Sequence, residues 1–272
     1  MHDWKRFFEE KAERATSDFE YDRGTSPRAT EIARLSTEEL LRFVDPQPWE
    51  VVFDAGCGTG ANISLLHLRV KEIIGMDYCD GAIARCERRL VTDRIKNVRL
   101  MRGDVTAPPL SDNSVDKILC TSVLQYLTDT DVRKSFAEFA RILRDQGILI
   151  LHVKNLSSLY LSTLWAVKKT KLLLRMKTKV QYLRSHGWYV MELQAFGFEI
   201  VAYNSFNLFA VELMPNVLRR FFEKLELKYY NQFPFRLGLM RRHGSELKFK
   251  ARLKKFPNSL TASPVRRGSL SD

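Results

Sequence analysis

The sequence contains no run of about 18 consecutive apolar residues, the length that a helix needs to cross a lipid bilayer. Its first fifteen residues, MHDWKRFFEEKAERA, also lack the apolar segment of a secretory signal. Both absences favour a cytoplasmic protein, with contact at the periphery of a membrane as a second option. At 272 residues, the chain is long enough to bury the core of one α/β domain.

Cysteine is scarce, and the four that occur are Cys57, Cys79, Cys86 and Cys120. None of them belongs to a C-x-x-C pair, and no histidines cluster near them in the sequence. The pattern therefore indicates neither a zinc site nor a disulfide framework. We expect these cysteines to be small core or loop residues, and we expect no bound metal.

Acidic residues are missing from Gln146 to Met191, and the formal net charge of the whole chain is +12. Eight basic residues lie between Lys154 and Arg184. Such an asymmetry favours an anionic neighbour, which is a substrate, a nucleic acid or a lipid surface. The alternative is a solvated helix face that only keeps the protein in solution.

The segment VVFDAGCGTGANI, from Val51 to Ile63, combines a short apolar run with three glycines at alternate positions. The apolar run predicts a buried parallel strand, and the glycines predict a tight turn that opens a helix. Glycine allows a ligand to lie against bare backbone in such a turn. The spacing is G-x-G-x-G, so it differs from the dinucleotide fingerprint, and no Gly-Lys-Ser/Thr follows as in a P-loop.

The pattern D-x-G-x-G-x-G resembles motif I of class I S-adenosylmethionine-dependent methyltransferases. Three further segments strengthen the resemblance. EIIGMD (72–77) ends in an acid 19 residues beyond Gly58, and a strand over 98–101 leads into Arg102-Gly103-Asp104-Val105. The third segment is a strand over 115–121 followed by SVLQYL, which is similar to motif IV of the family.

The resemblance implies that S-adenosyl-L-methionine is the cofactor and S-adenosyl-L-homocysteine its product. Asp77 would accept hydrogen bonds from the ribose hydroxyls, and Asp104 would accept one from the adenine amino group. Tyr78 or Val105 would cover a face of the adenine, and Thr121 or Ser122 would lie beside the sulfonium. The methionine end would rest on backbone of the loop, and the remaining cofactor-binding candidates are Asp54, Ala55, Gly56, Cys57, Gly58, Gly60 and Gly103.

Strand and helix patterns alternate through residue 153, which predicts a Rossmann-like, doubly wound α/β fold with a mostly parallel sheet. With strands over 198–206 and 245–253, the resemblance implies seven strands, including an antiparallel strand at the sheet edge. Strands are expected at 50–54, 72–77, 97–102, 115–121 and 147–153, and helices at 60–69, 80–92, 129–143, 188–196 and 214–228.

Three segments flank or interrupt this expected domain, which spans 49–256. Residues 1–48 carry helical patterns and would form a lid over the cofactor, with Tyr21 and Arg28 as substrate-binding candidates. Residues 155–187 read as a basic helical cap inserted after the fifth strand, with an apolar face that also suits an anionic membrane. The polar tail 257–272 is expected to be disordered.

Candidates for a catalytic base are His152, at the end of the fifth strand, and His186, in the expected cap. Tyr126 and Gln125 follow the motif IV segment, where many relatives carry a histidine that this chain lacks. We keep Tyr126 as a further catalytic candidate and Gln125 as a substrate-binding candidate.

The methyl acceptor is the least constrained part of the prediction. The Asn/Asp-Pro-Pro-Tyr/Phe tetrapeptide of enzymes that methylate nucleic-acid amino groups is absent, because the chain reads CTSV at 120–123. We therefore expect transfer to an oxygen, or a nitrogen, of a small-molecule or lipid- or sugar-linked acceptor. RNA bound by the basic cap and the basic C-terminal segment is one alternative. A catalytically inactive, cofactor-binding interaction protein is another.

Overall fold

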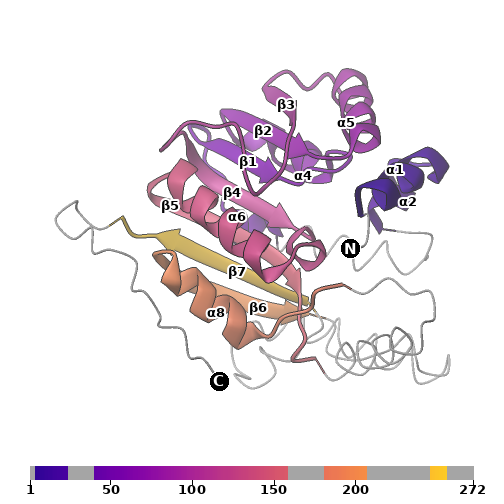
Figure 1. Ribbon diagram of the computed structural model, residues 1–272. Coiled ribbons are helices and arrows are strands. Elements are labelled where there is room, and N and C mark those ends of the chain that lie inside the picture. The colour runs from indigo at the N-terminus through magenta and orange to yellow at the C-terminus, as the bar shows by residue number, and fades with distance from the viewer. Residues whose placement is uncertain (1–3, 24–39, 159–180, 207–245, 256–272) are drawn as a thin grey trace, which may run out of the picture.

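A computed structural model describes residues 4–23, 40–158, 181–206 and 246–255 (Figure 1). Its centre is a seven-stranded sheet with the order β3-β2-β1-β4-β5-β7-β6. The strands are β1 Val51–Ala55, β2 Glu72–Asp77, β3 Val98–Arg102, β4 Val115–Thr121, β5 Leu143–Lys154, β6 Phe198–Phe206 and β7 Glu246–Leu253.

The described helices begin with a pair at the N-terminus and then follow the strands. They are α1 Trp4–Arg14, α2 Asp18–Arg23, α4 Ala61–Leu66, the 3₁₀ helix η1 His67–Arg69, α5 Asp80–Thr92, the 3₁₀ helix η2 Leu124–Tyr126, α6 Asp129–Ile142 and α8 His186–Ala195. Side-chain caps start α2, α6 and α8, and at α2 the Ser17 side chain accepts from the Glu20 amide at 3.1 Å. The Thr128 side chain accepts from the Asp131 amide at α6, and the Ser185 side chain accepts from the Trp188 amide at α8.

The predicted Rossmann-like α/β fold is confirmed, and several expected bounds agree with the observed ones, including strands 72–77, 115–121 and 198–206 and helix 80–92. The fifth strand starts earlier than expected, at Leu143 instead of 147. Its first residue pairs with Val115, and the register then shifts, so that Ile148 pairs with Lys117. Gln146, at φ +60°, lies in this irregularity, between the expected helix 129–143 and the expected strand 147–153.

The strands β1 to β5 are parallel, and β7 is the strand that runs against its neighbours. It lies between β5 and β6, so β6 forms this edge of the sheet. As a result, the start of β7 lies beside the carboxyl end of β5, with Glu246 opposite Lys154 and Lys248 opposite His152. This arrangement brings residues from late in the sequence to the end of the sheet where parallel strands place ligands.

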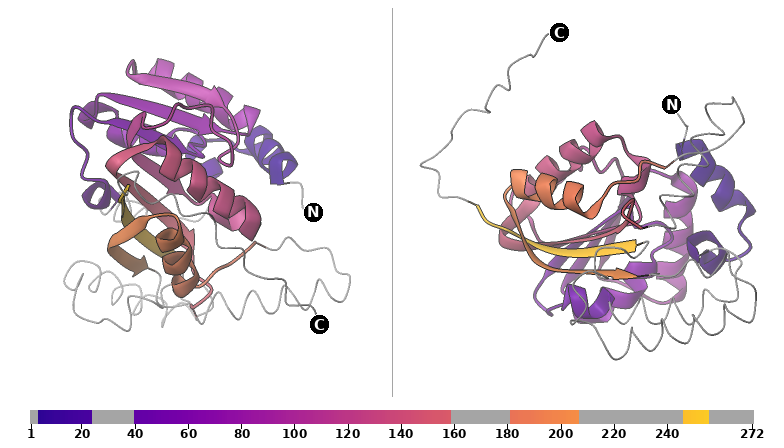
Figure 2. Two further views of the ribbon diagram at one scale, coloured as in Figure 1. Left: turned by 60° about the vertical axis from the view of Figure 1, so that its left-hand side comes forward. Right: turned by 90° about the horizontal axis from the view of Figure 1, so that it is seen from below.

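Helices cover both faces of the sheet, as Figures 1 and 2 show. Alternation along β1 explains the two layers, because Phe53 packs in one core cluster with α6 and α8, whereas Val52 packs in another with α4 and residues 40–44. In the parts of the chain that the structure describes, no helix is both long and apolar enough to cross a membrane.

Several predictions lie outside the described residues. These are the central part of the cap 155–187, a helix at 214–228, the tail 257–272 and the candidate Arg28. The lid and cap boundaries therefore stay predictions.

Candidate functional site

A cavity of about 720 Å³ opens at the carboxyl ends of the parallel strands. This volume lies within the range of about 300–1,000 Å³ that is usual for small-molecule sites. Ten of the predicted cofactor-binding residues line it, namely Gly56, Cys57, Gly58, Asp77, Tyr78, Gly103, Asp104, Val105, Thr121 and Ser122. Asp54, Ala55 and Gly60 support the loop from positions that do not line the cavity.

The loop after β1 depends on glycine for two separate reasons. Gly56, Gly58 and Gly60 have φ values of +82°, +54° and +85°, which L side chains rarely adopt. At Gly56, a Cβ atom would lie 2.2 Å from Val123 Cγ2, so there is also no space for a side chain. The Gly56 amide donates to the Met76 carbonyl at 2.8 Å and fixes the loop against the end of β2. The loop therefore presents backbone, and not side chains, to a ligand.

We expect Gly56→Ala to lower the free energy of unfolding by about 1–3 kcal/mol, because it adds strain at a positive φ and a clash with Val123. Chemical denaturation measures this loss. Gly187→Ala is the matched control, since a Cβ there meets nothing within 4 Å. That control should change stability by less than about 1 kcal/mol. Equal stabilities for the two variants would contradict the proposed packing of the loop.

Asp77 is held at the end of β2 by two backbone amides. Its Oδ2 accepts from the Gly58 amide and its Oδ1 from the Cys79 amide, each at 2.9 Å. Burial raises the pKa of Asp77, and the amides of Cys79, Gly58 and Tyr78 oppose that rise. Since each carboxylate oxygen can accept more than one hydrogen bond, capacity remains for the two hydroxyls of a ribose.

Asp104 and its neighbours occupy the next position along the sheet. Asp104 is exposed, and its Oδ1 accepts from both the amide and the hydroxyl of Thr106, each at 2.8 Å. Val105 is buried beside it and lines the cavity, as does Tyr78. An acid beside an apolar and an aromatic surface is suited to a flat base with an exocyclic amino group.

Asn62 is a site residue that the sequence analysis missed. Its Nδ2 lies 3.1 Å from Asp54 Oδ1 and 3.0 Å from Thr121 Oγ1. The amide therefore joins β1 to β4 at the floor of the cavity, whose lining it shares. Only its place in the first turn after the glycine loop distinguished it in the sequence, and a single asparagine there carries little information.

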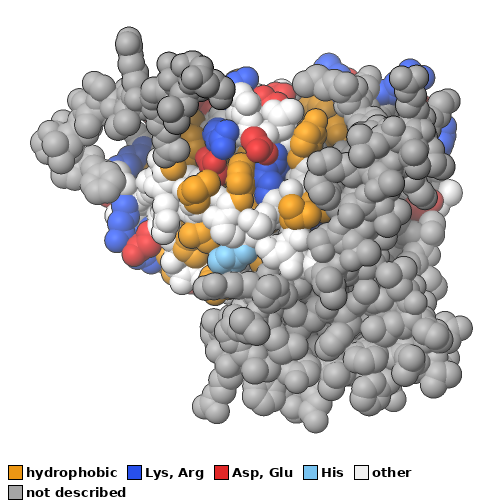
Figure 3. All heavy atoms as spheres, turned by 60° about the horizontal axis from the view of Figure 1, so that its bottom comes forward, with side chains coloured by type: hydrophobic (Ala, Val, Ile, Leu, Met, Phe, Trp, Pro, Cys, Tyr) orange, Lys and Arg blue, Asp and Glu red, His pale blue; other side chains and the backbone are white. Residues whose placement is uncertain are grey.

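His152 lines the cavity from β5, and its partner is Glu246 of β7. The distance from His152 Nε2 to Glu246 Oε2 is 2.7 Å. Burial by itself would raise the pKa of Glu246, but His152, Lys154 and Lys248 together lower it to about 2. Glu246 is therefore ionised at neutral pH. Figure 3 shows a face on which apolar, charged and histidine side chains mix, which is also the composition of the cavity lining.

The other catalytic and substrate candidates separate in the structure. Tyr126 lines the cavity, and burial raises its pKa. Gln125 is 1% exposed and does not line the cavity. His186 does not line the cavity, because its ring packs against Tyr203 and Phe249, with centroids 4.6 and 5.4 Å away. This position away from the cavity does not support a catalytic role for His186.

The N-terminal helices form one wall of the cavity. Trp4, Lys5, Phe8 and Lys11 of α1 line it, together with the predicted Tyr21 of α2. The rings of Trp4 and Phe8 lie 4.8 and 5.1 Å from that of Tyr126. An aromatic wall therefore faces the end of the cavity near β4.

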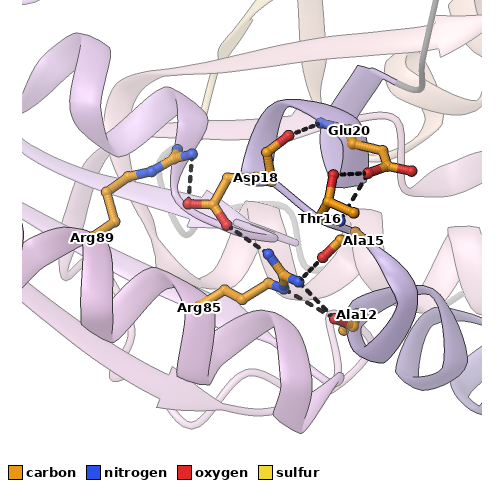
Figure 4. Close-up of polar contacts among 8 residues, drawn as sticks. Ala12, Ala15, Thr16, Asp18, Glu20, Arg85 and Arg89 are labelled. Atoms are coloured by element: carbon orange, nitrogen blue, oxygen red, sulfur yellow. Dashed lines mark hydrogen bonds and ion pairs between the residues drawn. The ribbon is translucent and has the colours of Figure 1, made fainter.

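Helices α1 and α5 cap each other. Glu9 of α1 accepts from the amides of Asp80 and Gly81 at 2.8 and 2.9 Å, at the start of α5. In return, Arg85 of α5 donates to the carbonyls of Ala12 and Ala15 at the end of α1, as Figure 4 shows. These contacts satisfy backbone groups that a helix end leaves without partners.

An acid of α2 and a glycine of α5 complete this interface. Asp18 bridges Arg85 and Arg89 at 3.1 and 3.0 Å (Figure 4). A Cβ on Gly81 would lie 2.7 Å from the Cβ of Ala12, so the close approach of α1 and α5 requires glycine.

The described ends of the basic segment 154–184 face inward. Arg184 is 4% exposed, bonds Asp129 at 2.8 Å, and donates to the carbonyls of Leu124 and Leu127. Lys154 Nζ donates to Gln181 Oε1 at 3.1 Å. These two residues therefore order the protein around η2 and do not form a free basic surface. Within the described ranges, no group of three or more His, Cys, Asp or Glu residues is placed to hold a metal ion.

Comparisons with known proteins agree with this geometry. A family described as "Methyltransferase domain" matches residues 53–151. A probable S-adenosylmethionine-dependent methyltransferase of Mycobacterium tuberculosis is 32% identical over 104 residues, which are 38% of this chain and 35% of that protein. The malonyl-[acyl-carrier protein] O-methyltransferase of Yersinia pestis is 30% identical over 122 residues, 45% of this chain and 43% of that one.

A solved structure is similar over most of the chain. It is phosphoethanolamine N-methyltransferase 1 of Haemonchus contortus, in complex with phosphoethanolamine and S-adenosylhomocysteine, with a TM-score of 0.65 and 15% identity. The similarity covers 95% of this chain and 50% of that one, and at this identity it supports the fold alone. The chain spans less than half the length of the two curated relatives above. Residues 53–151 of this chain, which carry the glycine loop and the ordered strand-end acids, match the methyltransferase domain family, and the chain is similar to S-adenosylmethionine-dependent methyltransferases.

Proposed function

We propose that this protein transfers a methyl group from S-adenosylmethionine to an oxygen, or a nitrogen, of a small-molecule or lipid- or sugar-linked acceptor. One observation carries the proposal. The cavity crosses the ends of β3, β2, β1, β4 and β5, and each of these ends contributes a different chemical group. The order of those groups along the sheet matches the order of the adenine, ribose and methionine parts in the cofactor.

The cofactor parts correspond to neighbouring strands. Asp104 after β3 suits the adenine amino group, Asp77 at β2 the ribose, and the bare backbone around Gly56 the methionine part. Thr121 of β4 and His152 of β5, which line the cavity on the next two strands, would then lie on the side of the sulfonium. The acceptor would then enter from the side of α1, Tyr126 and β7.

When bound, S-adenosylmethionine supplies an activated methyl carbon: the acceptor lone pair forms the new bond, the carbon–sulfur bond breaks, and sulfur keeps its electron pair. The protein contributes alignment and exclusion of water, worth several kcal/mol when the reacting atoms are held close. Trp4 and Phe8 cover the cavity, and Asn62 holds Thr121 in place. His152 is our candidate to receive a proton from the acceptor.

The relatives do not agree on the acceptor, because one is named for O-methylation of a carrier-protein substrate and another for N-methylation of phosphoethanolamine. RNA methylation stays a second candidate, resting on the formal net charge of +12. The third candidate, a binding protein without catalysis, predicts cofactor affinity with no transfer to any acceptor.

A transfer assay separates these three possibilities. The purified protein is incubated with S-adenosylmethionine carrying a labelled methyl group and with separate fractions of small molecules, lipids and small RNAs. We expect label in the small-molecule or lipid fraction, and a reduction with His152→Gln. Label in RNA would support the second candidate, and cofactor binding without label anywhere would support the third.

A further inference from the structure

We propose that Glu246 is a positioning residue that holds His152 in the tautomer needed to take a proton from a hydroxyl acceptor. This inference rests on the proposed methyltransferase function and deepens it, because it names the class of acceptor. It starts from the 2.7 Å contact between His152 Nε2 and Glu246 Oε2, two residues that lie 94 positions apart in the sequence.

Strand register places this pair at the acceptor end of the cavity. His152 pairs with Thr121 on the parallel strand β4 and with Lys248 on the antiparallel strand β7. Paired residues point to the same face of a sheet, and Thr121, His152 and Lys248 all line the cavity. Glu246 lies two residues before Lys248 on that face, so it reaches His152 diagonally.

The contact determines which imidazole nitrogen is available. An ionised carboxylate only accepts hydrogen bonds, so Nε2 must carry the hydrogen that Glu246 accepts. Nδ1 of the neutral ring then has the lone pair. Within the described parts of the chain, no hydrogen bond to Nδ1 is present. Glu246 therefore leaves Nδ1 as the proton acceptor and stabilises the imidazolium that forms when the proton arrives.

The charges around the ring favour a hydroxyl over an ammonium group as the acceptor. In addition to His152, two described cations lower the pKa of Glu246. They are Lys154 of β5 and Lys248 of β7. Tyr126 of η2 and Asp131 of α6 also line the cavity. Two cations beside one carboxylate repel an ammonium substrate, whereas they stabilise the negative charge that develops on an oxygen losing its proton.

The proposed step is balanced. The hydroxyl oxygen forms the new bond to the methyl carbon while its O–H bond breaks, and the proton moves to His152 Nδ1. The imidazolium keeps its Nε2 hydrogen bond to Glu246 and returns the proton to water after the products leave. The reaction requires no other reactant.

The test is a nitrogen NMR measurement of the full chain, labelled with ¹⁵N in its five histidines, without cofactor and with S-adenosylhomocysteine. Spectra of His152→Gln assign the His152 signals. In the wild type at pH above 8, we expect a protonated Nε2 and a bare Nδ1. In Glu246→Gln, we expect a mixture of both tautomers. Glu246→Asp retains a carboxylate and should restore at least part of the Nε2-protonated form.

Glu199→Gln is the matched control. Glu199 of β6 is half exposed and forms an ion pair with Lys254, the residue after β7. This variant should leave the His152 signals unchanged. A wild-type His152 protonated at Nδ1 would overturn the proposal without any variant, as would an unchanged tautomer in Glu246→Gln. Cofactor titration separately tests the methyltransferase proposal, so loss of that function does not obscure the tautomer result.

The acceptor class has its own readout. In whichever fraction the wild type labels, Glu246→Gln should slow methyl incorporation about 10- to 100-fold. Glu199→Gln should show the wild-type rate. Phosphoethanolamine, supplied as a defined amine probe, should stay unlabelled, and its methylation would overturn the hydroxyl assignment.

Discussion

Asp77→Asn should weaken S-adenosylmethionine binding about 100-fold or more, because the ionised carboxylate is the group expected to hold both ribose hydroxyls. Hydrogen bonds to a charged group contribute about 1.5–3 kcal/mol each, so weakening two of them has an effect of this size. Asparagine keeps one oxygen that can accept from an amide of Gly58 or Cys79, so the β2–α5 turn is disturbed less than by alanine. Isothermal calorimetry with the cofactor and its demethylated product measures the loss.

Asp93→Asn is the control for this experiment. It removes the same charge from an exposed position after α5, away from the cavity lining, and should bind the cofactor as the wild type does. Wild-type affinity in Asp77→Asn would remove the central support for the proposed binding mode.

The pH dependence of cofactor binding gives a related result. Burial raises the pKa of Asp77, so the folded protein disfavours its charged form. Ionisation of Asp77 therefore lowers the free energy of unfolding as the pH rises through the raised pKa. Below that pKa the carboxyl is protonated, and this loss of stability is absent. The pH dependence of cofactor affinity has the opposite sign, because the ribose hydroxyls are expected to bind the ionised carboxylate. Affinity should fall on acidification at a higher pH than an ordinary aspartate would give.

Arg85→Met should release α1 and α2 from α5. The guanidinium donates to the carbonyls of Ala12 and Ala15 and pairs with Asp18, and its side chain is only 14% exposed. Methionine keeps an apolar stem but leaves these acceptors without their donor. We expect the local free energy of opening of residues 4–23 to fall by about 2 kcal/mol or more.

Hydrogen exchange detects this release as faster exchange of the amides of α1 and α2, while the central sheet stays protected. Arg88→Met, on the exposed face of the same helix, is the matched control and should leave exchange unchanged. Glu9 adds a pH effect. The amides of Gly81 and Asp80 outweigh burial and lower its pKa, so its contribution to docking is present at neutral pH and is lost on acidification. Unchanged exchange in Arg85→Met would contradict the docking role of Arg85 and would mean that the Glu9 caps, the Asp18–Arg89 pair and the aromatic contacts hold α1 and α2 without it.

The sequence by itself determined the cofactor side of the site. Strands β2, β4 and β6 and helix α5 have the predicted bounds, because alternating or continuous apolar patterns and cap residues are local signals. The role of the glycines could be predicted for the same reason, because the positive φ at Gly56 is required by the local backbone of the turn. Asp77 is the last residue of β2 and Asp104 lies two residues after β3, so their place at the cavity followed from parallel strand order.

Tertiary structure alone decided the acceptor side. His152 and Glu246 lie 94 residues apart, and their contact depends on β7 entering between β5 and β6. The mutual capping of α1 and α5 joins residues more than 70 positions apart. No local sequence pattern predicts such pairs, because a glutamate or arginine on a solvent-exposed face cannot be told from one in a tertiary contact by its sequence neighbours. Which of them meet depends on strand order and helix docking, and that arrangement is reached only when the whole core packs.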